Sequence, residues 1–199
     1  QPLSWCYFLT HPNGFDSFVR TNLHSGHFKG ALTHAGNVGL WGGLVSIGAH
    51  FAQIPISELS SLADLPLWAA APAYMAPLIC GVFTLFVSWR ASSKDTTLHL
   101  SLWMTTYFLA YKDVWEHHYV FLLPVLIALY LRNPDVRLLC IYGALALPTP
   151  FVFFDTQPGV YGPIDPERTW NVATSLVYRS AKLAPTIALW IYIARQLRC

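Results

Sequence analysis

The amino-acid sequence predicts an all-α integral membrane protein, built as a helical bundle with about five spans. The 199 residues are 54% hydrophobic and only 11% charged, with a mean hydropathy of +0.42, whereas soluble domains carry about 25% charged residues. Long apolar runs recur along the chain, and a spanning helix needs about 20 mostly apolar residues. The eight Trp, ten Tyr and twelve Phe residues are typical of aromatic belts at two membrane interfaces.

Residues 1–64 contain no run that could span a membrane, and we expect them to form an outer-face loop followed by an interfacial amphipathic helix. They are rich in His, Gly and Asn. In "LWGGLVSIGAHFAQI" apolar residues recur at helical spacing, with small and polar residues between them. These apolar positions are Leu40, Leu44, Ile47, Phe51 and Ile54. A re-entrant element without a ligand role is the alternative interpretation.

Residues 65–199 are expected to form the five-span bundle. The first run is long but interrupted by prolines, the second is shorter and more polar, and the third is short. The fifth carries Arg179 and Lys182 in its first turns. The expected spans are 65–89, 96–112, 118–131, 136–154 and 175–194.

Basic residues in the short loops predict the orientation of these spans. "RASSKD", "RNPDVR" and the tail "RQLRC" face the cytoplasm by the positive-inside rule. Residues 1–64, 112–117 and 155–174 then face outward, and they hold most of the histidines and acidic residues. We therefore expect a multi-pass protein of the plasma (inner) membrane whose active face lies outside the cytoplasm.

Charge and cysteine usage exclude other classes. The net charge of +2 is too small to predict a nucleic-acid surface. The four cysteines show no CxxC spacing, so no metal site is expected. The chain opens on "QPLSWCYFLTHP" without Met or a signal peptide, so we expect it to be the C-terminal portion of a longer membrane protein.

The segment "KDVWEHH" (112–118) is the first candidate site. If it is helical, Asp113 and His117 are four residues apart and share a face, and the carboxylate would fix the imidazole tautomer and raise its basicity. His118 would then point about 100° away. Metal binding is less favoured, because adjacent histidines suit one ion poorly, and an interface belt is the structural alternative. The candidate catalytic residues are His117, His118, Asp113 and Glu116.

Cations near the outer face form the second candidate site. Arg179 and Lys182 are three residues apart inside a span, where ionisable groups usually have a function, and they suit an anionic lipid phosphate. Snorkelling toward headgroups is the alternative, and Lys112 is a weaker candidate.

The Gly-rich turn "HAGNVGLWGG" is a third candidate, because backbone N–H groups at a helix start attract phosphate. There Asn37 is either a phosphate contact or the helix N-cap.

Two of these segments resemble a known family. "VWEHHYVFLLPVLIALYL" is similar to the WxHHxVxLLP-type segment of a bacterial family of multi-spanning glycosyltransferases with the GT-C fold. "HAGNVGLWGGLVSIGAHF" resembles the Gly/Asn turn and small-residue helix of that family's outer-loop segment. Order and spacing agree over about residues 30–132, and beyond them the likeness is in hydropathy only.

The resemblance implies an inverting, metal-independent transferase without a cofactor. Such enzymes move a hexose, typically mannose, from a polyprenyl-phosphate donor to a lipid or glycan acceptor in the membrane. The histidine segment would lie near the donor phosphate or the acceptor, and an acidic residue of the first outer loop usually serves as base. This sequence departs from the family in three ways. About ten spans are usual, the base is expected upstream of residue 1, and Gly39 stands where Ser is common.

Two other function classes stay open. A secondary transporter would place its polar site at the bilayer midplane, with broken helices, whereas the polar groups here are expected at one face. A non-catalytic membrane assembly subunit is the other alternative. The expected partners are the polyprenyl-phosphate sugar donor, its acceptor and membrane lipids, with no nucleic acid.

Overall fold

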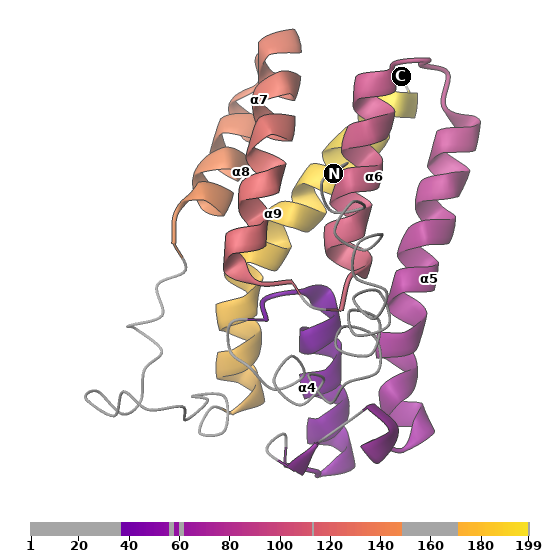
Figure 1. Ribbon diagram of the computed structural model, residues 1–199, viewed down its shortest axis with the longest axis vertical. Coiled ribbons are helices and arrows are strands. Elements are labelled where there is room, and N and C mark those ends of the chain that lie inside the picture. The colour runs from indigo at the N-terminus through magenta and orange to yellow at the C-terminus, as the bar shows by residue number, and fades with distance from the viewer. Residues whose placement is uncertain (1–36, 56–57, 60–61, 113, 149–170, 199) are drawn as a thin grey trace, which may run out of the picture.

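The structure of the protein is a computed structural model. It describes residues 37–55, 58–59, 62–112, 114–148 and 171–198, and of Glu116 only the backbone. Every regular element in these ranges is a helix, apart from an isolated β-bridge between Asn37 and Trp115 (Figure 1). The prediction of an all-α fold is therefore confirmed for the described part of the chain.

The helices form a bundle with two halves. The elements are α4 (Leu40–Ala52), η3 (Leu62–Asp64), α5 (Leu67–Arg90), α6 (Thr96–Ala110), η4 (Glu116–Leu122), α7 (Leu123–Arg132), α8 (Val136–Ala146) and α9 (Val172–Arg198). Helices α5 and α9 run the length of the bundle (Figure 1). Helices α6, α7 and α8 pack along one half, and α4 packs along the other half against α5 and α9.

Each half has its own apolar core. Buried side chains of α6, α7, α8 and α9 form one cluster, which includes Leu102, Leu126 and Leu189. The second cluster joins α4 to the start of α5 through Trp41 and Val45. The start of α4 meets the segment between α6 and η4 through the bridge between Asn37 and Trp115, so a polar site there lies where the two halves join.

Local capping explains where several helices begin. The Asp95 carboxylate accepts hydrogen bonds from the N–H groups of Thr97 and Leu98 at the start of α6, and Asp135 does the same for Arg137 at the start of α8. Carboxylates are favoured N-caps because the first four N–H groups of a helix lack partners. Pro124 lies in the first turn of α7, where its missing N–H costs no hydrogen bond.

All five predicted spans contain helix, but three of the helices are shorter than expected. Helices α6, α7 and α8 have 15, 10 and 11 residues, and even 15 residues rise only about 22 Å against a hydrocarbon core of about 30 Å. Among the described helices, α5 alone is long and apolar enough to cross a membrane by length and composition. Residues 149–154 of the fourth run lie outside the described residues.

Helix α5 presents small residues inward and large apolar residues outward. Its buried positions are Ala69, Ala70, Ala73, Ala76, Cys80, Thr84 and Val87. Its outward side chains include Trp68, Leu78, Ile79, Leu85 and Trp89, of which Trp89 is 76% exposed. A soluble helix buries its large apolar side chains instead.

Helix α4 also presents small residues inward, although it buries Trp41 and Val45 beside them. Its buried face holds Gly42, Gly43, Ser46 and Gly48, among other residues, whereas Phe51 of the predicted apolar stripe is 69% exposed. A Cβ atom at Gly48 would lie 2.3 Å from the carbonyl oxygen of Ala69. Small residues let α4 and α5 approach this closely. Of the predicted apolar stripe, Leu44 and Ile54 pack against the α4–α5 core, and Phe51 faces outward.

Candidate functional site

Asn37 joins the start of α4 to the segment that follows α6. Its side chain is fully buried. Its Nδ2 donates to the carbonyl oxygen of Lys112 at 2.9 Å, and its Oδ1 accepts from the N–H groups of Gly39 at 3.3 Å and Val114 at 3.4 Å. The N–H of Val38 also donates to the carbonyl oxygen of Val114 at 2.9 Å. The predicted N-cap role of Asn37 is wrong, because Gly39 caps α4 and the amide is used for this long-range junction.

Because of this junction, "KDVWEHH" does not form the continuous helix expected from the sequence. Trp115 is extended and bridges to Asn37, and the 3₁₀ helix η4 begins only at Glu116. The expected helical face shared by Asp113 and His117 is therefore wrong, because no helix runs through Val114 and Trp115. Asp113 itself and the side chain of Glu116 lie outside the described residues. The segment lies about halfway along α5, not at an end of the bundle (Figure 1).

His117 and His118 have different surroundings. Nδ1 of His118 accepts a hydrogen bond from the N–H of Trp115 at 3.2 Å, and the N–H of His118 donates to the Trp115 carbonyl oxygen at 2.9 Å. His118 therefore caps the start of η4, and an accepting Nδ1 places the proton of a neutral ring on Nε2. The His117 ring is exposed, with its centroid 4.4 Å from that of His118.

His117 and Lys182 line one cavity of about 450 Å³ between η4, the end of α8 and α9. The Lys182 side chain is 1% exposed. Its Nζ donates to the carbonyl oxygens of Ala144, Leu145 and Leu147. An ammonium at the C-terminal end of a helix satisfies carbonyls that lack partners and is favoured by the helix dipole. The described contacts of Lys182 thus hold the end of α8 against α9.

Arg179 lies one turn away from Lys182, on the side facing α4. It is also 1% exposed, and its Nε donates to Oγ of Ser175 at 3.2 Å. A Cβ atom at Gly42 would lie 2.6 Å from Nη1 of Arg179 and 3.4 Å from the carbonyl oxygen of Asn37. The guanidinium therefore sits at the first turn of α4 because Gly42 has no side chain. The hydroxyl of Tyr119 in η4 donates to the carbonyl oxygen of Val38 at 3.4 Å, so η4 also contacts the start of α4.

A second cavity, of about 630 Å³, opens beside the junction. Its described lining comes from α4, the η3 region, α5 and the end of α6: Trp41, Leu62, Ala63, Ala73, Tyr74, Pro77, Ala110, Tyr111 and Lys112. Lys112 is the one charged residue in this lining, and it lies two residues after the end of α6. The cavity is thus an apolar groove with a cation where it meets the Asn37 junction.

The structure brings the candidates into two groups. Asn37, Lys112 and Arg179 gather around the start of α4, whereas His117 and Lys182 share the smaller cavity. Sequence reasoning missed Gly42 and Tyr119. The Gly-Gly pair in "GLWGGL" was the available signal for a close approach. Among the described residues no three His, Cys, Asp or Glu side chains gather as ligands for a metal ion.

Comparisons of the chain with protein-family models, with curated proteins and with solved structures found no match.

Proposed function

We propose that the chain is part of an integral membrane glycosyltransferase. It would transfer a hexose, with mannose expected, from a polyprenyl-phosphate donor to a lipid or glycan acceptor. The observation that carries the proposal is the burial of Arg179 at the first turn of α4, where Asn37 and Val38 bind residues of the segment that holds the histidines. A buried guanidinium next to helix N–H groups is suited to an anionic phosphate.

The exterior of the bundle supports a membrane location. Large apolar side chains are exposed along α5, α6, η4, α7 and α8, including Trp68, Leu100, Phe121 and Leu131. Charged and hydroxylated side chains of α9 face the interior instead, among them Ser175, Arg179, Lys182 and Thr186. This distribution suits a hydrocarbon solvent, in which ionisable groups turn toward the interior of the bundle.

The apolar groove supports a polyprenyl donor. Its walls come from Trp41, Tyr74 and Pro77, and Lys112 stands where it meets the Asn37 junction. An isoprenoid chain lying along this groove would place its phosphate near the start of α4. The cations Lys112 and Arg179 would then neutralise the phosphate from two sides.

The reaction follows from this placement. An acceptor hydroxyl attacks the anomeric carbon of the sugar, and the bond from that carbon to the phosphate oxygen breaks. The electron pair leaves with the polyprenyl phosphate, whose charge Arg179 stabilises. The hydroxyl proton passes to a carboxylate base, which the resemblance places in the first outer loop. Attack opposite the leaving group inverts the anomeric configuration. His117, in the neighbouring cavity, would orient the acceptor.

The proposal is tested by a transfer assay. Membranes from cells producing the full-length protein are incubated with radiolabelled polyprenyl-phosphate mannose, and labelled lipid or glycan products are separated and counted. We expect transfer above that of membranes without the protein. The double variant H117A/H118A should lose it, and full activity of that variant would contradict the proposed site.

A secondary transporter is the second candidate, and one observation favours it. The start of α4, the end of α6 and the start of η4 meet about halfway along α5 (Figure 1), and broken helices with a midplane polar site are typical of transporters. The two candidates differ in their products. Proteoliposomes that accumulate an intact solute, without chemical change, would favour the transporter. Release of polyprenyl phosphate with a new glycosidic bond would favour the transferase.

A further inference from the structure

A polar cavity of about 550 Å³ lies at the end of the bundle away from α4. Its polar lining residues come from the α5–α6 connection, the end of α7 and α9: Ser92, Ser93, Arg132, Asn133, Tyr192 and Gln196. Its apolar floor is Leu98 and Leu129, both buried. None of the residues that the sequence predicted for catalysis or donor binding lines this cavity.

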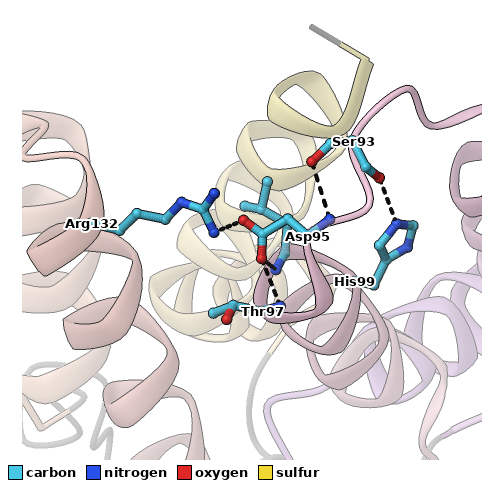
Figure 2. Close-up of polar contacts among 6 residues, drawn as sticks. Ser93, Asp95, Thr97, His99 and Arg132 are labelled. Carbon is cyan, nitrogen blue, oxygen red and sulfur yellow. Dashed lines mark hydrogen bonds and ion pairs between the residues drawn. The ribbon is translucent and has the colours of Figure 1, made fainter.

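An ion pair holds the guanidinium at this cavity. Figure 2 shows Arg132, from the last turn of α7, reaching across to Asp95, the N-cap of α6. One Asp95 oxygen accepts from the N–H groups of Thr97 at 2.8 Å and Leu98 at 3.2 Å, and the other pairs with Nη1 of Arg132. Oγ of Ser93 accepts from the N–H of Asp95 at 3.3 Å. The ion pair engages one nitrogen of a guanidinium that carries five N–H donors.

The same end of the bundle is rich in cations. We call it the basic end, defined by Arg90, Lys94, Arg132, Arg137, Arg195 and Arg198. The acidic residues at this end of the described chain are Asp95 and Asp135. The Arg90 guanidinium lies 5.4 Å from the ring centroid of Phe86 and 5.5 Å from that of Trp89. Cations beside aromatic rings at helix ends are typical of a membrane interface, where anionic headgroups attract them.

We infer that this cavity binds the phosphate group of an anionic phospholipid headgroup. The guanidinium of Arg132, the Ser92 hydroxyl and the Asn133 amide are the donors that this lining offers to phosphate oxygens. The floor of Leu98 and Leu129 suits the glycerol and first acyl carbons, which free phosphate lacks. The inference rests on the membrane location proposed above, and it is independent of sugar transfer.

Lipid binding to the purified full chain tests this inference. The protein in neutral detergent is titrated with dioleoyl phosphatidylglycerol and, separately, with dioleoyl phosphatidylcholine, and bound lipid is measured by native mass spectrometry. We expect phosphatidylglycerol to bind about tenfold more tightly. Equal binding of the two lipids would overturn the inference. A competition of the bound lipid with inorganic phosphate then shows which part of the lipid the cavity recognises. Displacement of the lipid shows recognition of the phosphate group alone, and retention shows recognition of the whole headgroup.

Three variants locate the binding. R132Q and R137Q each remove one cation from the basic end, but only Arg132 lines the cavity. S92A/N133A removes neutral donors on exposed connections and keeps the Arg132–Asp95 pair, so folding is preserved. We expect R132Q and S92A/N133A to lower the affinity for phosphatidylglycerol about tenfold and R137Q to leave it near wild type. Equal losses in R132Q and R137Q, or wild-type affinity of S92A/N133A, would contradict a site at this cavity.

Discussion

Gly42 provides the space that the guanidinium of Arg179 occupies: a Cβ atom at Gly42 would lie 2.6 Å from Nη1 and 3.2 Å from Cζ of Arg179. This contact joins α4 to α9 across a long stretch of sequence. It makes the position of the buried cation depend on a residue without a side chain. Helix α4 therefore both offers its N–H groups and fixes where the charge beside them lies.

The first prediction concerns this glycine. G42A should displace the Arg179 guanidinium and destabilise the fold by about 2 kcal/mol, with loss of transfer activity. G43A is the matched control, since the nearest atoms to its new methyl lie at 3.8 and 3.9 Å, an ordinary contact distance. Its higher helix propensity should make it neutral or stabilising by up to ~1 kcal/mol. Thermal melts of the purified variants measure both effects, and equal melting temperatures would contradict the packing described.

The second prediction concerns the contact of α4 with α5. G48A should destabilise the fold more than G42A, because its methyl would lie 2.3 Å from the backbone carbonyl oxygen of Ala69. A backbone carbonyl cannot move away by changing rotamer, as a side chain can. We expect about 3 kcal/mol of destabilisation. G81A, on α5 with nothing within 4 Å of the new Cβ, is the control. A G48A protein that melts with the wild type would show that the two helices are further apart.

The positions of the helices were predictable from the sequence because apolar runs and capping carboxylates are local signals. The runs at 65–89 and 175–194 correspond to α5 and α9. Asp95 and Asp135 are the N-caps of α6 and α8. The lengths of α6, α7 and α8 were not predictable in this way. An apolar run in the sequence can extend past the last residue of a helix when the residues beyond are also apolar, so the run does not mark where the helix ends.

The candidate site was predictable in its residues but not in its geometry. Asn37 pairs with residues 112–114, far along the chain, and this pairing replaces the helix expected through "KDVWEHH". No local pattern reveals such a contact. The sequence likewise shows that Arg179 is unusual within an apolar run, but its position at α4 depends on Gly42.

The third prediction separates the two histidines. H118A removes the acceptor of the Trp115 N–H and should cost about 1 kcal/mol of stability, whereas H117A, an exposed ring, should melt like the wild type. Transfer activity should fall in H117A at unchanged stability, because its ring lines the cavity shared with Lys182. Melting temperature and transfer rate are measured on both variants. A lower melting temperature of H117A together with a wild-type melting temperature of H118A would contradict these roles.

The fourth prediction concerns Lys182. K182M keeps the length of the side chain but removes the donors to the carbonyl oxygens of Ala144, Leu145 and Leu147. Leaving these acceptors without their donor, the Leu145 carbonyl among them buried, should cost about 1–3 kcal/mol. K94M, at an exposed position on the basic end, is the control and should melt with the wild type. Hydrogen exchange should rise at the end of α8 in K182M, and unchanged exchange there would argue against the capping role.

In the function proposed here, Arg179 holds the phosphate of a polyprenyl-linked sugar. The most direct measurement is sugar transfer from radiolabelled polyprenyl-phosphate mannose by membranes carrying wild-type, R179Q or R195Q full-length protein at matched amounts. Arg195 lies on the same helix, exposed at the basic end, and controls for loss of one charge. We expect transfer by the wild type and R195Q, and a loss of about a hundredfold or more in R179Q. Wild-type transfer by a folded R179Q protein would contradict it.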